Sequence, residues 1–117
     1  MNILVTGATG FIGGAVKRRL MADGHSVHAS TIRLTGDANW SSDLQAIDVV
    51  VHTAARVHVM RETALDSLAE FRLVNVEGTA RLARQAVVAG VKRFIFLSSI
   101  KVNGEATMPG RPFTAED

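Results

Sequence analysis

The hydrophobic and polar positions of the chain fall into segments that predict strands and helices in alternation. An apolar run at 2–5 predicts a buried strand, and the pattern over 11–22 predicts a helix with one apolar face. Further strands are predicted at 26–31, 48–52 and 91–97, the last two buried because of their continuous β-branched, aliphatic or aromatic character. A helical pattern covers 62–89 with interruptions at Asn75 and Gly78, and 104–117 is predicted to be loop.

The segment after the second predicted strand breaks this alternation. Parallel strands need a crossover of roughly a dozen residues or more, usually a helix, yet 31–37 carries no helical pattern. Residues 39–44 predict only a short turn or helix around Trp40. Either the second strand is long, or a crossover is missing here.

Strands that alternate with helices predict an α/β fold. We expect a doubly wound parallel sheet with helices on both faces, formed by a single domain that covers residues 1–117. In such sheets ligands bind at the carboxyl ends of the strands. The segments at 7–13, 52–56 and 98–99 all follow predicted strands, so we expect them to meet at one edge of the sheet.

Three glycines connect the first predicted strand to the first predicted helix with the spacing G-x-x-G-x-x-G. Gly7 lets the chain turn sharply, Gly10 removes a Cβ that would hold a pyrophosphate away from the backbone, and Gly13 lets the helix pack closely on the sheet. Phosphates bind well at the amino end of a helix. An ordinary strand-to-helix turn can carry the same spacing, so the pattern by itself leaves both interpretations open.

Composition narrows the class of protein. With 47% hydrophobic and 21% charged residues among 117, the chain is typical of globular proteins, and no apolar run reaches the ~20 residues that span a bilayer. The absence of cysteine and of a basic leader predicts a cytoplasmic protein without a membrane partner. The 13 Lys and Arg and the 11 Asp and Glu are spread along the chain, so no nucleic-acid partner is expected. The four histidines show no metal-ligand spacing, and no metal is expected.

Four motifs in order resemble one known family. They are TGATGFIG at 6–13, VHTAA at 51–55, VNVEGT at 74–79 and LSSIKVNG at 97–104. The chain resembles the extended short-chain dehydrogenase/reductases, and within them the nucleotide-sugar epimerase/dehydratase branch that includes the UDP-glucose and UDP-N-acetylglucosamine 4-epimerases. The resemblance implies a truncated Rossmann-type domain that binds NAD, and a reaction in which NAD takes a hydride from C4 of a nucleotide sugar and returns it.

The resemblance also assigns roles to individual residues. It places the pyrophosphate of the cofactor on Gly7, Gly10, Phe11, Ile12 and Gly13. Ala54 and Ala55 would line the adenosine side, Asp37 would meet the adenine, Asn75 would support the active site, and Ser98 would lie at the strand end. Ser99 matches the catalytic serine, which hydrogen-bonds the reacting hydroxyl or carbonyl of the substrate.

The residues at the end of the second predicted strand leave the choice between NAD and NADP open. Family members that prefer NAD carry an acidic residue there for the ribose hydroxyls, whereas this chain has Thr31 with Arg33 nearby. Arginine at such a place accommodates the 2′-phosphate of NADP. NAD is expected first because of the epimerase resemblance, and NADP stays open.

The family's catalytic tyrosine and lysine lie further along the chain than Ser99, and this sequence contains no tyrosine. We therefore expect the N-terminal part of a longer protein, without the Tyr/Lys region and the substrate domain, and inactive alone. The alternatives to a 4-epimerase are an NADP-dependent carbonyl reductase, a sugar dehydratase and a non-catalytic dinucleotide-binding module. A homodimer through the 62–89 helix is expected only by analogy of fold.

Overall fold

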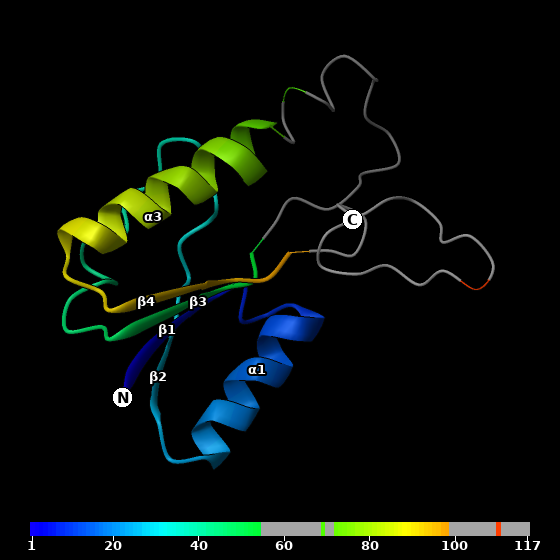
Figure 1. The fold of residues 1–117 in the computed structure, drawn as a ribbon, viewed down its shortest axis with the longest axis vertical. Coiled ribbons are helices and arrows are strands. Elements are labelled where there is room, and N and C mark those ends of the chain that lie inside the picture. The colour runs from blue at the N-terminus through cyan, green and yellow to red at the C-terminus, as the bar shows by residue number, and fades with distance from the viewer. Residues whose placement is uncertain (55–68, 70–71, 99–109, 111–117) are drawn as a thin grey trace.

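A parallel sheet with a helix on each face organises the chain (Figure 1). The computed structural model describes residues 1–54, 69, 72–98 and 110. The elements are β1 (Asn2–Thr6), α1 (Phe11–Ala22), β2 (Ser26–Ala29), β3 (Val49–His52), the π-helical segment η1 (Arg72–Gly78), α3 (Thr79–Val88) and β4 (Arg93–Phe96). The described strands pair in the order β2-β1-β3-β4, and every pair is parallel. The predicted α/β class is confirmed.

Alternation along the central strands divides the core into two layers. In β1, Ile3 and Val5 pack on the side of α1 with Val49 and Val51 of β3, whereas Leu4 packs on the side of α3. Both faces of these strands are therefore apolar, which explains their continuous hydrophobic runs. The layer under α3 is the larger, and its buried members are Leu4, Leu34, Ala38, Trp40, Leu44, Val50, Leu82 and Ala86.

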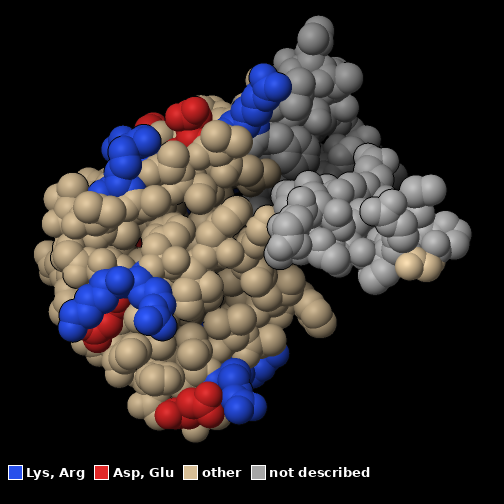
Figure 2. Space-filling view, viewed as in Figure 1, with Lys and Arg blue, Asp and Glu red and all other residues tan. Residues whose placement is uncertain are grey.

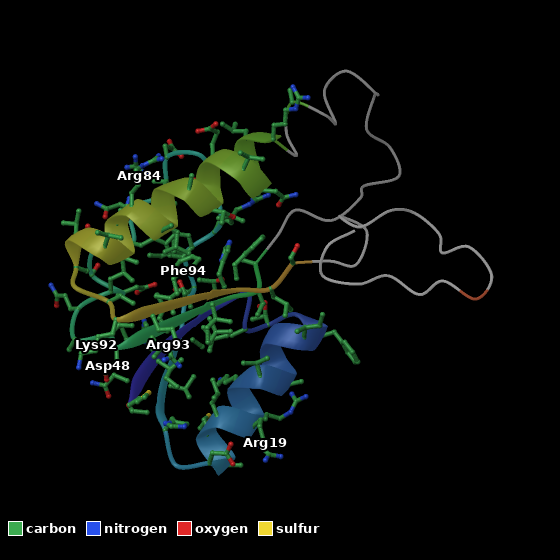
Figure 3. The ribbon with its side chains drawn as sticks, viewed as in Figure 1. Arg19, Asp48, Arg84, Lys92, Arg93 and Phe94 are labelled. Atoms are coloured by element: carbon green, nitrogen blue, oxygen red, sulfur yellow. The ribbon has the colours of Figure 1, made fainter. Side chains whose placement is uncertain are left out.

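The last strand differs from its prediction. The sequence predicts a buried strand at 91–97, but Ile95, Phe96 and Leu97 are 43%, 53% and 45% exposed. β4 pairs only with β3, so it is an edge of the described sheet. Phe94 points toward α3 and packs against the core (Figure 3).

The connection from β2 to β3 contains no helix. Residues 30–48 are all described, and they form neither a helix nor a strand, only turns at 36–37 and 41–46. β2 ends at Ala29, two residues before the predicted end, because the Ser30 hydroxyl accepts a hydrogen bond from the Ile32 N–H at 3.1 Å and turns the backbone away. The second strand is therefore short, and no further strand lies between it and Asp37.

Helix α3 holds this extended connection in place. Arg81 Nε and Gln85 Nε2 donate to the Ala38 carbonyl at 2.6 and 3.0 Å, and Gln85 Oε1 accepts from the Trp40 N–H at 2.7 Å. Trp40 is fully buried in the core beneath α3. The indole thus anchors the connection in the core.

Gly78 marks the change from η1 to α3. A Cβ on Gly78 would stand 2.9 Å from both Leu34 Cδ1 and the Thr35 carbonyl oxygen, so the connection passes directly against the helix at this point. Of the predicted helix over 62–89, the structure describes residue 69 and residues 72–88, and all of these are helical. The predicted interruption at Gly78 coincides with the change from π-helix to α-helix.

The amino ends of the strands are joined at Asp48. Its Oδ2 accepts from the Asn2 N–H at 2.8 Å, and its carbonyl accepts from the Lys92 N–H at 2.9 Å. Figure 3 shows Asp48, Lys92 and Arg93 together at this end of the sheet. These contacts make Asp48 a structural cap and leave the opposite, carboxyl end of the sheet for function.

The core under α3 gives a stability prediction. Leu82→Ala removes a fully buried side chain, and we expect it to lower the free energy of unfolding by about 2–5 kcal/mol. Val88→Ala, in the same helix but 89% exposed, is the control and is expected to change it by less than ~0.5 kcal/mol. Urea unfolding followed by circular dichroism measures both, and equal losses would contradict this description of the core.

Candidate functional site

A cavity of about 840 Å³ lies at the carboxyl ends of β1, β2 and β3. Its volume is in the range of small-molecule and cofactor sites. The lining comes from the glycine loop, from the segment after β2, from the end of β3 and from η1. These residues are Gly7, Ala8, Thr9, Gly10, Phe11, Ile12, Gly13, Ser30, Thr31, Ile32, Arg33, Leu34, Thr53, Ala54 and Val74.

Close backbone packing shapes the glycine loop. Gly7 has φ +68°, a conformation that favours glycine, and a Cβ there would stand 2.8 Å from the Ala54 nitrogen. A Cβ on Gly13 would overlap the Gly7 carbonyl. Gly10 has more room, since a Cβ there would meet only the Gly7 carbonyl oxygen, at 3.3 Å. Gly7 and Gly13 are thus needed to form the loop, while Gly10 leaves its outer side open.

Helix α1 begins at this loop without a side-chain cap. Gly10 is the N-cap, and no side chain hydrogen-bonds the first turn. The first N–H groups of an α-helix have no partner within the helix, and Phe11, Ile12 and Gly13 of this turn all line the cavity. Such a helix end binds phosphate or another anion.

A buried hydrogen-bond network joins the ends of β1 and β3. Thr6 Oγ1 accepts from the backbone N–H groups of Thr53 and Ala54 at 3.1 and 3.2 Å, and it lies 2.6 Å from His52 Nδ1. With both lone pairs used, the hydroxyl gives its hydrogen to Nδ1. His52 Nε2 therefore carries the ring hydrogen and donates to Thr79 Oγ1 at 2.9 Å.

The network requires a neutral histidine. His52 is fully buried between Thr6, Thr79 and the rings of Phe94 and Phe96. Burial away from water lowers the pKa of His52 from 6.5 to about 4. A protonated Nδ1 would face a hydroxyl with no lone pair left. His52 is thus a structural residue that fixes the strand ends next to the glycine loop.

The structure brings most of the predicted cofactor residues to one cavity. Those in its lining are Gly7, Gly10, Phe11, Ile12, Gly13, Thr31, Arg33 and Ala54. Asp37, Asn75 and Ser98 are described but are not part of the lining. Ala55 and Ser99 lie outside the described residues, so their roles stay predictions.

Two groups of residues at this site had no individual role predicted from the sequence. Ser30 and Thr53 each line the cavity directly after a strand, and their position at a strand end was the available signal. Thr6 and Thr79 hold His52, but they are far apart in the sequence and nothing in it pairs them.

Among the described residues, no group of three or more His, Cys, Asp or Glu side chains is arranged to hold a metal ion. None of the described helices is long and apolar enough to cross a membrane. On the face shown in Figure 2, the basic side chains form small separate groups, several beside acidic side chains, and no continuous patch.

The parallel sheet, the glycine loop and the helix on each face define a domain of the Rossmann type. A family model for the NAD-dependent epimerase/dehydratase family matches residues 3–117. The chain therefore belongs to this family.

A curated relative supports the same conclusion. The UDP-glucose 4-epimerase of Vibrio cholerae is 44% identical to this chain. The alignment covers 99% of this chain but only 40% of the relative's length. Their alignment runs over 131 residues, although the chain has only 117, so it includes positions that have no counterpart here. Residues of the relative are therefore missing from this chain within the aligned region.

Two solved structures are similar in both fold and sequence. A short-chain dehydrogenase/reductase superfamily protein from Agrobacterium tumefaciens with bound NAD is 33% identical, with a TM-score of 0.74 over 89% of this chain and 34% of its own. MoeE5 in complex with UDP-glucose and NAD is 31% identical, with a TM-score of 0.76 over 91% of this chain and 39% of its own.

The buried histidine predicts a pH-dependent stability. Because the folded state lowers the pKa of His52 to about 4, the unfolded state binds the proton more tightly. The contribution of neutral His52 to the free energy of unfolding is then fully present above pH 6.5. It is lost as the pH drops toward 4, by at most about 1.4 kcal/mol per pH unit for this one group.

Urea unfolding at several pH values between about 4.5 and 7.5 measures this slope. In His52→Asn, the amide oxygen still accepts from Thr6, but the titrating group is gone, so the slope should become shallower. His25→Asn leaves the Thr6–His52 contact intact and should keep the slope of the parent. A parent slope retained in His52→Asn would show that other groups cause it.

Proposed function

We propose that the chain is the NAD-binding part of a nucleotide-sugar 4-epimerase. The observation that carries the proposal is the uncapped amino end of α1, which opens through the glycine loop into the cavity. The 44% identity with a UDP-glucose 4-epimerase supports the choice of reaction, and the two NAD-bound structures support the choice of cofactor.

The lining residues fit a dinucleotide. Backbone N–H groups of the first turn of α1 would hold the pyrophosphate, and the open side of Gly10 would let it approach the chain. Ala54, with its small side chain, would border the adenosine. The bound nicotinamide would supply a hydride acceptor for C4 of the sugar and a donor for its return.

Binding and chemistry are divided along the chain. The described residues bind and orient the cofactor, and Ser99 would hydrogen-bond the reacting oxygen of the sugar. The chain spans 40% of the Vibrio relative, and we propose that turnover requires further residues with a tyrosine and a lysine. By itself the chain would bind the cofactor without turnover.

A sugar dehydratase of the same fold is the second candidate, because the family model covers epimerases and dehydratases alike. The two reactions differ in product, since an epimerase inverts C4 and a dehydratase releases water. The complete protein incubated with UDP-glucose distinguishes them by the product that forms.

The glycine loop gives the test of binding. Gly10→Val places a branched side chain on the open side of the loop, where the pyrophosphate would lie, and we expect NAD binding to be lost. Ala15→Val places the same branched side chain at an exposed position of α1 outside the cavity and should bind as the parent does. Isothermal titration calorimetry measures both, and undiminished binding by Gly10→Val would leave the loop a merely structural turn.

The catalytic serine is tested in the complete protein. Ser99→Ala removes the hydroxyl proposed to contact the reacting oxygen, and we expect kcat to fall about 100-fold or more while the NAD affinity stays within about twofold. Steady-state kinetics and calorimetry separate the two quantities. Unchanged turnover would remove Ser99 from the mechanism.

A further inference from the structure

The segment that follows β2 borders the cavity without an acidic residue of its own. In dinucleotide-binding folds, an acid about 20 residues after the glycine turn binds the ribose 2′-hydroxyl. Here the corresponding residues are Ser30 to Arg33, and all of them line the cavity. Sequence alone therefore gives no group that selects against the 2′-phosphate of NADP.

The tertiary structure brings a carboxylate to this place from elsewhere in the chain. Asp43, in the turn at 41–46, accepts a hydrogen bond from Ser30 Oγ through Oδ2 at 2.6 Å. Its Oδ1 lies 3.0 Å from His28 Nε2 in β2. The side chain of Asp43 is only 17% exposed. The carboxylate is thus held at the end of β2, directly behind a residue of the cavity wall.

These contacts fix the hydrogen-bonding character of Ser30. Its hydroxyl gives its one hydrogen to Asp43 and accepts from the Ile32 N–H at 3.1 Å. One lone pair is left, so Ser30 can only accept a further hydrogen bond. A ribose hydroxyl can donate that bond. The 2′-phosphate dianion cannot, and it would also meet the charge of Asp43.

We propose that Asp43 is a positioning residue that acts through Ser30 to make the cavity select NAD, with its free ribose 2′-hydroxyl, over NADP. The proposal rests on the proposed function. Arg33 lines the same cavity and favours a 2′-phosphate, but it is exposed, and water screens its charge. Asp43 is mostly buried and held by two partners, so its charge is screened less.

The test is the ratio of the dissociation constants for NAD and NADP, measured by calorimetry on the purified protein. The parent should prefer NAD. Asp43→Asn keeps an oxygen to accept from Ser30 but removes the charge, so the preference should shrink by about threefold to tenfold, chiefly through tighter NADP binding. A purely structural role of Asp43 would weaken both cofactors alike and leave the ratio unchanged.

Two further variants sharpen the test. Ser30→Ala removes the acceptor and should weaken NAD binding about fivefold with little change for NADP. Asp23→Asn makes the same charge change at the far end of α1, where Asp23 pairs with Arg19, and should leave the ratio unaltered. Thermal melts of each variant establish that it is folded.

The outcomes separate this inference from the proposed function. A parent that binds neither dinucleotide would overturn both. A parent that binds NAD, with a ratio that neither Asp43→Asn nor Ser30→Ala changes, would overturn the role of Asp43 alone, and so would a parent that prefers NADP.

Discussion

The close approach of two backbone segments, at Gly7 and at Ala54, is the constraint on which the site depends. Neither Gly7 nor Gly13 has space for a Cβ, so the end of β1, the start of α1 and the segment after β3 pack backbone against backbone. The amino end of α1 is thereby placed at the carboxyl edge of the sheet and directed into the cavity. A larger residue at either glycine would separate these segments.

Hydrogen bonds at the same edge hold this packing in one arrangement. The Thr6 hydroxyl serves three partners at once, two backbone N–H groups after β3 and the ring of His52. Because the ring is buried and uncharged, the network contains no ion that would need solvation. A fully satisfied polar network in a dry region is rigid and specifies one geometry. The glycine loop therefore rests on a rigid support.

The non-helical connection between β2 and β3 links stability to the proposed selectivity. It packs Leu34, Ala38 and Trp40 into the core beneath α3, where the Trp40 N–H also donates to Gln85. Further along this connection, Asp43 lies beside the end of β2, where it accepts a hydrogen bond from Ser30. The chain thus lacks an acid in the customary place along the sequence, but Asp43 hydrogen-bonds Ser30 at the end of β2.

The sequence by itself determined the α/β class, the alternation of elements, the glycine loop and the family, because each is written in local patterns and short motifs. It predicted the strand at 26–31 too long and the strand at 91–97 as buried. The first of these strands ends early because the Ser30 hydroxyl accepts a hydrogen bond from the Ile32 N–H and turns the backbone. The second is partly exposed because only β3 pairs with it in the described sheet. Only the tertiary structure decided the partners of His52 and Asp43, since Thr79 and Ser30 lie 27 and 13 residues away from them and no spacing rule connects such pairs.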